Sequence, residues 1–145
     1  MSEQPSEGSS AGPFLGALAI IVAVVIGILL FNVFSSDEPT PDQQIARAVS
    51  AQNDALQRRD YAGFLEYTCA AQHGEETEVL SAQRDSVDKH GERVVDRVAG
   101  VAIDGDRATA QVTYYFDKDP DAEETVDVEL AREAGSWKVC STGPS

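Results

Sequence analysis

One uninterrupted apolar segment, Phe14 to Phe34, constrains this chain more than any other feature. Every residue in it is hydrophobic except Gly16, Gly27 and Asn32, and it contains no charge. A helix of this length extends roughly 30 Å, which is the thickness of the hydrocarbon core of a bilayer. Because a bilayer offers no water to backbone groups, a crossing segment must close its hydrogen bonds internally as a helix. The sequence therefore predicts one transmembrane helix over residues 14–34.

A cleavable signal peptide is the main alternative for this segment, and the flanking residues disfavour it. A signal peptide needs a basic n-region, a shorter apolar core and a small-residue cleavage site. The residues before Phe14 include Glu3 and Glu7 but no lysine or arginine, and no cysteine lies near the segment to carry a lipid. We therefore expect the helix to be retained as a membrane anchor.

Small residues on one side of this helix predict a surface for helix–helix contact, although such residues are also common in membrane helices that pack against nothing. They are Gly16, Ala19, Ala23 and Gly27. If this face is used, it would let two helices approach closely.

The charge of the chain limits its partners. It has 25 acidic and 11 basic residues, which gives a formal net charge of −14. A surface this negative repels phosphate backbones and anionic lipid headgroups, so we expect neither nucleic-acid binding nor peripheral docking on lipid. Basic, cationic or neutral partners are compatible with it, and solubility alone explains the same charge.

Four segments are expected along the chain. Residues 1–13 are rich in serine, glycine, proline and glutamate and predict a disordered cytoplasmic tail. The transmembrane helix over 14–34 is followed by a short polar linker over 35–40 and by one extracytoplasmic domain over 41–145. The last segment is long enough for one domain and too short for two.

The chain has two cysteines, Cys69 and Cys140. Neither has a CxxC neighbour or a histidine at ligand spacing, which argues against a zinc site and against a redox dithiol. A disulfide between them would tie the last strand to the helical part, and such bonds persist outside the cytoplasm. Two buried free thiols are the alternative. The positive-inside rule gives almost no signal here, so the orientation in the cell membrane, tail in the cytoplasm and domain outside, depends mainly on this bond.

Apolar residues at helical spacing predict three helices at the start of the domain. The first begins at a capping box formed by Thr40 and Gln43 and runs to about Arg59, with glutamine, arginine and asparagine on its solvent face. Its buried face is expected to consist of Ile45, Ala48, Val49 and Leu56. The other two helices are expected over Tyr61 to about Ala70 and over about Glu75 to Lys89.

Alternating residues after Arg93 predict an antiparallel sheet of about four strands. A slip in the alternation near Gly100 suits a β-bulge, and Asp104-Gly105-Asp106 is typical of a tight turn. The expected strands are Arg93–Ile103, Arg107–Asp117, Glu124–Arg132 and Trp137–Cys140, with a loop over Lys118–Ala122. Helices followed by such a sheet make the domain α+β.

Three local sequences in this order resemble a known superfamily. They are the helix start Asp60-Tyr61-Ala62-Gly63-Phe64, the turns at Gly105 and Gly135, and the ending Gly135-Ser136-Trp137-Lys138-Val139-Cys140. Together, over Pro41 to Ser141, they resemble the cone-shaped domains of the nuclear transport factor 2 superfamily, and within it the membrane-anchored or secreted branch of high-GC Gram-positive bacteria. That branch often carries one cysteine in the second helix and one after the terminal Trp-Lys-Val, which Cys69 and Cys140 match.

This resemblance implies a curved sheet that wraps the helices and leaves a pocket. Some members of the superfamily use the pocket for catalysis and many use it only for binding. Relatives often dimerise through the sheet, and the sequence leaves a homodimer open. The pocket residues that the resemblance suggests here are Tyr61, Asp96, Tyr114 and Trp137.

No enzyme motif of the superfamily matches this sequence, so we assign no catalytic residue and expect no cofactor. An isomerase or hydratase of the same fold would need Asp96 or His73 buried beside an apolar cavity with a shifted pKa. The simpler interpretation is that Asp96 is solvated, that His73 and His90 are exposed, and that the aromatic residues belong to the core.

Alternating carboxylates over Asp117 to Glu124 suggest a weak cation loop, but the pattern lacks the glycine and the final glutamate of an EF-hand. We therefore expect a solvated acidic loop and no metal site. The sequence as a whole favours a non-enzymatic, membrane-tethered, extracytoplasmic domain that binds an envelope protein or an apolar small ligand. The alternatives are the enzyme described above and a structural subunit recruited through the small-residue face of its anchor.

Overall fold

The computed structural model describes residues 11–34 and 38–141. They belong to two compact units, and the boundary between the units along the chain falls between Glu38 and Pro39. The first unit contains helix α1, Ala11–Phe34, which is long and apolar enough over Gly12–Phe34 to cross a membrane. Its only polar side chain, Asn32, donates from Nδ2 to the carbonyl oxygen of Ile28 at 3.0 Å and is thus satisfied within the helix. Most of the predicted tail and half of the predicted linker lie outside the described residues.

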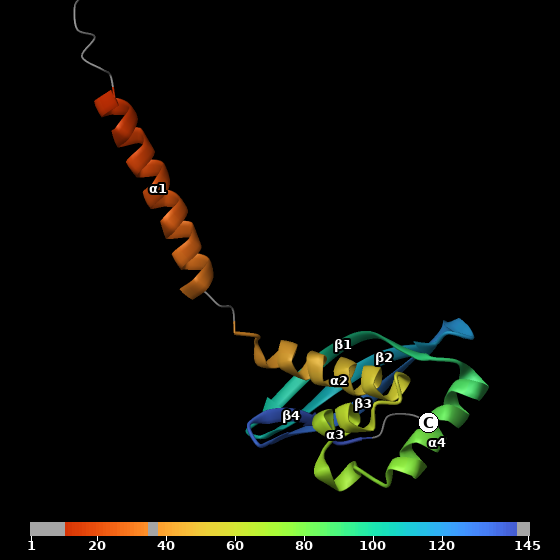
Figure 1. Ribbon diagram of the computed structural model, residues 1–145. Helices are drawn as coiled ribbons and strands as arrows, with labels where there is room; N and C mark the ends of the chain where they lie inside the picture. The colour runs from red at the N-terminus through yellow and green to blue at the C-terminus, as the bar shows by residue number, and fades with distance from the viewer. Residues whose placement is uncertain (1–10, 35–37, 142–145) are drawn as a thin grey trace, which may run out of the picture. The chain divides into compact units, whose positions relative to one another are not determined.

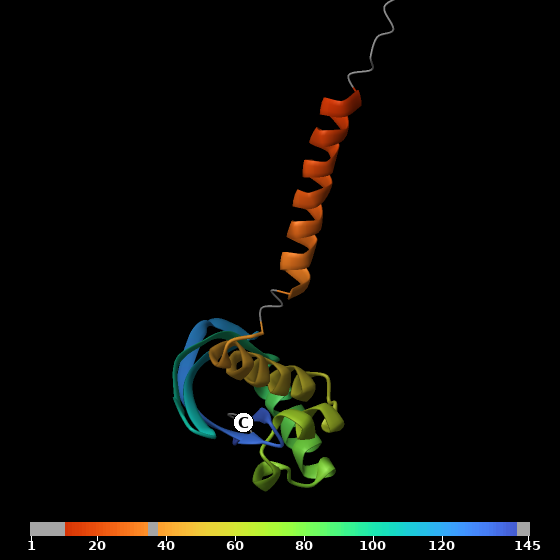
Figure 2. The ribbon, with the colours of Figure 1, turned by 90° about the vertical axis from the view of Figure 1, so that its left-hand side faces the viewer.

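The second unit is α+β, as predicted, with three α-helices and one short 3-10 helix followed by four strands. The helices are α2 (Pro41–Gln57), α3 (Tyr61–Tyr67), η1 (Ala70–Gln72) and α4 (Glu76–His90). The strands are β1 (Arg93–Asp104), β2 (Arg107–Phe116), β3 (Asp119–Glu133) and β4 (Ser136–Val139), all antiparallel in the order β1-β2-β3-β4. Figure 1 and Figure 2 show the sheet curving around the helices like an open cone.

Helix α2 is the inner element of this cone. It starts at the predicted capping box, in which the Thr40 hydroxyl accepts from the Gln43 backbone and the Gln43 side chain accepts from the Thr40 backbone. Its buried side chains lie against the inner face of β2, β3 and β4, whose residues alternate between core and solvent. That core consists of Ile45, Ala48, Val49, Ala108, Ala110, Val112, Val128, Leu130, Trp137 and Val139.

A second, smaller cluster joins α2 to α3. Ala55 and Leu56 pack against Phe64, whose side chain is fully buried, and the partly buried Val79 of α4 lies against this cluster. No described residue of α4 is fully buried. Helix α4 is therefore the least embedded of the three helices.

Two β-bulges bend β1. The predicted bulge at Gly100 is present, with φ +59° at this glycine and a register shift between Ala99 and Ala102. A second shift between Val95 and Arg97 leaves Asp96 as the extra residue, which the sequence did not indicate. Each bulge strengthens the local twist, and this accounts for the curvature of the sheet.

Two predicted boundaries are wrong. Helix α3 ends at Tyr67 and not near Ala70, because Thr68 is extended and bridges Val139, and the Cys69 backbone N–H donates to the Val139 carbonyl oxygen at 2.8 Å. The expected loop over Lys118–Ala122 shrinks to a turn between Phe116 and Asp119, since β3 already begins at Asp119.

The two cysteines are bonded to each other. Cys69 follows α3, Cys140 follows β4, and their Cα atoms lie 4.8 Å apart across a sequence separation of 71. The bond therefore ties the end of the last strand to the helical layer, in the arrangement that the sequence suggested.

Candidate functional site

An open cleft of about 390 Å³ lies where the end of α4 meets the ends of β2 and β3. We call it the mouth cleft. Its lining residues are Lys89, His90, Tyr114, Phe116, Lys118, Asp119, Ala122 and Glu124. Pockets that hold small molecules typically measure roughly 300–1,000 Å³ and combine aromatic surface with a few convergent polar groups. The mouth cleft has both properties.

Its floor is aromatic because β2 presents alternate residues to the inside of the sheet. Tyr114 and Phe116 are two positions apart and their rings meet edge to face, with centroids 5.7 Å apart. The His90 ring lies across Phe116 at a centroid distance of 5.0 Å. This contact connects the last turn of α4 to the floor of the cleft.

Tyr114 is the most perturbed acid at the cleft. Only 2% of this residue is exposed, and its hydroxyl donates to Glu124 Oε2 at 2.6 Å. Burial of the phenol and the hydrogen bond to the Glu124 carboxylate raise the pKa of Tyr114 to about 12, against a smaller opposing effect of Arg93. The phenol is therefore a neutral donor at physiological pH.

This pKa gives a pH-dependent prediction. Because the folded chain holds the phenolic proton more tightly, the stability contributed by Tyr114 is complete below its ordinary pKa of 10.0 and is lost as pH rises towards about 12. In a spectrophotometric tyrosine titration, we expect a component near pH 12 that Tyr114→Phe removes. Glu124→Gln should lower its midpoint without restoring the ordinary value, since burial is the larger cause. Titration curves that do not differ between wild type and Tyr114→Phe would contradict this assignment.

The interior of the cone beneath Tyr114 is almost filled. The cavity there has a volume of about 30 Å³ and is lined mainly by valines of α2 and the sheet, with Tyr114 forming the boundary to the mouth cleft. A volume of this size accommodates about one water molecule. An organic ligand therefore has room in the mouth cleft and none in the interior.

A polar network missed by the sequence analysis surrounds this cavity. Gln52 and Asn53, expected on the solvent face of α2, are only 3% and 7% exposed. Gln52 Nε2 donates to Thr68 Oγ1 at 2.9 Å and to the Ser141 carbonyl oxygen at 2.7 Å. Asn53 Nδ2 donates to the Arg93 carbonyl oxygen at 3.0 Å, and Asn53 Oδ1 accepts from Arg93 Nε at 2.7 Å.

Arg93 is buried, which lowers the pKa of its guanidinium, and it lies 5.9 Å from the centre of the Tyr114 ring. The signal for this network was present in the sequence, because Gln52 and Asn53 continue the spacing of Ile45, Ala48 and Val49 along one helix face.

The wall of the cleft formed by α4 is fixed at its C-terminal end. Lys118 Nζ donates to the Asp88 carbonyl oxygen at 2.6 Å, and the Gly91 N–H donates to the Val87 carbonyl oxygen at 2.8 Å. Asp117 Oδ1 accepts from the Glu92 N–H at 3.0 Å. In the middle of α4, Gln83 Nε2 donates to Gln57 Oε1 at 3.1 Å. These contacts hold the basic end of α4 over the aromatic floor.

The structure does not bring the four suggested pocket residues together. Tyr114 lines the mouth cleft, but Trp137 is buried in the core beneath the Arg132 guanidinium, 4.7 Å from its ring centre. Tyr61 is half-buried on α3 and donates to the Gly74 carbonyl oxygen at 2.6 Å.

Asp96 is exposed, because the bulge turns it away from the cone. His73, expected in solvent, is instead half-buried with Nε2 2.9 Å from the Thr68 carbonyl oxygen. Neither residue lies beside the interior cavity, which the enzyme alternative required of at least one of them.

Two other features, possible metal ligands and the small-residue face of α1, add no residue to the mouth cleft. Over residues 11–34 and 38–141, no group of three or more His, Cys, Asp or Glu residues is placed to hold a metal ion. The small-residue face of α1, with Gly16, Ala19, Ala23 and Gly27, is exposed along the described helix.

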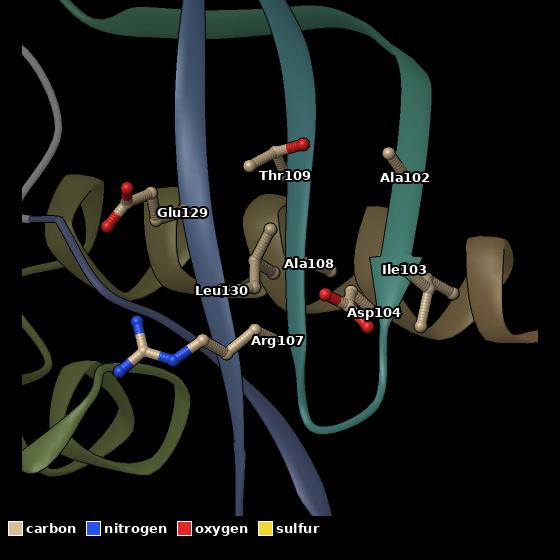
Figure 3. A pocket seen from close by; sticks show the side chains of 8 residues that line it. All are labelled: Ala102, Ile103, Asp104, Arg107, Ala108, Thr109, Glu129 and Leu130. Atoms are coloured by element: carbon tan, nitrogen blue, oxygen red, sulfur yellow. The ribbon is translucent and has the colours of Figure 1, made fainter.

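A second cavity of about 220 Å³ lies at the opposite end of the sheet, beside the β1–β2 turn. Figure 3 shows Ala108 and Leu130 on β2 and β3, with Ile103 on β1 beyond them. Ile103 is 41% exposed, and the charged residues here, Asp104, Arg107 and Glu129, are exposed as well. This cavity is shallow and mostly apolar, and it lacks the aromatic floor of the mouth cleft.

Comparisons with known proteins support the fold. No protein-family profile and no curated protein matches this chain. Among solved structures, a protein of unknown function with a cystatin-like fold from Nostoc punctiforme is 14% identical, with a TM-score of 0.51 over 66% of this chain and 83% of that one. An NTF2-like protein from Campylobacter jejuni is 17% identical, with a TM-score of 0.47 over 64% of this chain and 94% of that one. The likeness to the Nostoc punctiforme structure, at this identity, concerns the fold alone.

Proposed function

We propose that this cystatin-like domain is a non-catalytic binding domain, held outside the cytoplasm by a single membrane-spanning helix, and that its ligand enters the mouth cleft. One observation carries the proposal: the mouth cleft has a volume of about 390 Å³, whereas the interior cavity has about 30 Å³. A filled interior favours recognition of the ligand at the rim of the cone. The ligand is an envelope protein segment or a small molecule.

The non-catalytic part of the proposal is supported by the positions of the two candidate bases. Asp96 is exposed on a bulge, and the His73 ring is engaged with the Thr68 carbonyl. The resemblance of the two cysteine positions to the membrane-anchored or secreted branch of high-GC Gram-positive bacteria agrees with a tethered binding role.

Two features support the proposed topology. Helix α1 has the length and composition of a membrane span, and the Cys69–Cys140 bond favours an oxidising compartment. We therefore propose that the N-terminus is cytoplasmic and that the domain lies outside. A homodimer formed through the sheet is compatible with this topology.

The proposed topology predicts that both cysteines are oxidised to a disulfide in the cell and do not react with a thiol reagent before reduction. When intact cells are lysed in the presence of a large maleimide, we expect no mass shift without reductant and a shift of two adducts after reduction and denaturation. The physical reason is that both thiols of the chain are in one disulfide. Modification of both cysteines without prior reduction would contradict an extracytoplasmic domain.

The binding site can be tested by photo-crosslinking in intact cells. A benzoylphenylalanine at Ala122, an exposed position lining the mouth cleft, should form an adduct with the bound partner. The matched control is the same group at Ala99, which is exposed on β1 and lies outside the lining of the cleft. Adducts at Ala99 and none at Ala122 would place recognition elsewhere on the domain.

A further inference from the structure

The mouth cleft has walls of opposite charge. The α4 side carries Lys89, and the ammonium of Lys118, from the β2–β3 turn, is held at the same side by its bond to the Asp88 carbonyl. The β3 side carries Asp119 and Glu124, the latter held on the Tyr114 hydroxyl. The Lys118 ammonium and the Glu124 carboxylate are held by separate hydrogen bonds, to the Asp88 carbonyl and from the Tyr114 hydroxyl, so these two groups are not each other's hydrogen-bond partners.

We propose that the mouth cleft binds a small zwitterion with a flat aromatic body. Its carboxylate lies towards Lys89 and Lys118, its ammonium towards Asp119 and Glu124, and its ring lies on Phe116. This inference rests on the proposed function, and it names the chemical class of the ligand.

The lining disfavours a ligand with a single charge. A cation meets the ammonium groups of the α4 wall, whereas an anion meets two carboxylates and approaches a chain of net charge −14. A ligand carrying both charges satisfies both walls at once. The Lys118 ammonium donates one of its three hydrogens to Asp88 and keeps the others for a ligand.

The distribution of lysine supports this assignment. The chain has three lysines, Lys89, Lys118 and Lys138, and the first two line the same cleft although they are far apart in the sequence. One of the two histidines, His90, lies there as well. Its ring and that of Phe116 form the edge of a surface on which a flat ligand can stack.

Three matched probes test the inference. Phenylalanine carries both charges, phenethylamine is the same molecule without the carboxylate, and 3-phenylpropionate is the same molecule without the ammonium. The full chain in lipid nanodiscs, with isotope-labelled histidine, gives imidazole signals from only two residues. His90 reports the mouth cleft, and His73, which lies outside its lining, is the internal control.

We expect phenylalanine to shift the His90 signal, leave His73 unchanged and bind about tenfold more tightly than either single-charge probe, which is the value of one charge-assisted hydrogen bond. Lys89→Gln should remove most of the affinity advantage that phenylalanine has over phenethylamine. Glu124→Gln should remove most of its affinity advantage over 3-phenylpropionate. Lys138→Gln, a lysine outside the cleft lining, should leave both advantages intact.

Three results would overturn the inference: no shift of His90 with any probe, equal affinity for all three, or an advantage that neither cleft variant reduces. A fourth probe, N-acetylphenylalaninamide, separates this failure from failure of the proposed function. If this uncharged mimic of a phenylalanine within a protein chain binds as well as phenylalanine, the cleft is a binding site but the zwitterion is wrong. If none of the four probes shifts His90 and the Ala122 crosslink is absent, the proposed function fails together with the inference.

Discussion

Replacing both cysteines, in Cys69→Ser/Cys140→Ser, is expected to lower the free energy of unfolding of the domain by about 4 kcal/mol. The bond joins positions separated by 71 residues, so its loss frees a long loop in the unfolded chain. A small domain is stable by only about 5–15 kcal/mol, so this loss is a large share of the total. Urea unfolding of the detergent-solubilised chain, followed by Trp137 fluorescence, measures the change.

Trp137 is a suitable reporter, because it is the only tryptophan and lies on β4, three residues before Cys140. The control is the wild-type chain with added reductant, which should unfold at the same urea concentration as the double variant. An unchanged midpoint in the double variant would show that the contacts of β4 with β3 and Thr68 hold the C-terminal end without the bond.

Gly91→Ala should also destabilise the domain strongly, by about 3 kcal/mol. Gly91 joins α4 to β1 with φ +86° and ψ −171°, a conformation that is essentially restricted to glycine. A Cβ there would lie 1.7 Å from Asp117 Oδ1, which accepts the Glu92 N–H. The alanine therefore adds backbone strain and breaks the contact that positions the α4 wall of the mouth cleft.

The matched control is Gly105→Ala in the β1–β2 turn. Gly105 also has positive φ, at +61°, but no atom lies within 4 Å of the added Cβ. Only the left-handed backbone strain applies there, about 1 kcal/mol. Equal losses in the two variants, measured by the same urea unfolding, would show that the Asp117 contact does not matter.

The sequence was sufficient for the parts of the fold that follow from local rules. The capping box at Thr40 fixed the start of α2, and the alternation over Arg107–Asp117 predicted the central strand β2. The slip near Gly100 predicted a real bulge, because only glycine adopts its positive φ without strain.

Features that depend on long-range contacts could not be predicted from the sequence. Gln52 and Asn53 were placed on the solvent face because amides are usually exposed, yet their partners are Thr68, Arg93 and Ser141, which are distant in sequence. The carboxylates after Asp117 suggested a loop, whereas pairing with β2 extends Asp119 and its neighbours into a strand.

The mouth cleft itself could be predicted only in part. Tyr114 was named as a pocket residue, but the basic side chains of α4 and of the β2–β3 turn meet over it only because the Asp117 and Lys118 contacts fix the end of α4. No local pattern around Lys89 or Lys118 indicates that they share one cleft. Asp96 is exposed, as the simpler interpretation of the sequence expected, but the bulge that leaves it unpaired had no glycine signal.

Native mass spectrometry of the full chain, extracted in mild detergent from the membranes of the organism that makes it, tests the central claim most directly. The account predicts an intact chain with bound additional mass, small molecule or protein, that is lost on denaturation. Ala122→Trp, which fills the mouth cleft, should be free of that mass, while the control Ala99→Trp on β1 should retain it. A bare wild-type chain, or a bound mass that survives Ala122→Trp, would contradict the mouth cleft as the binding site.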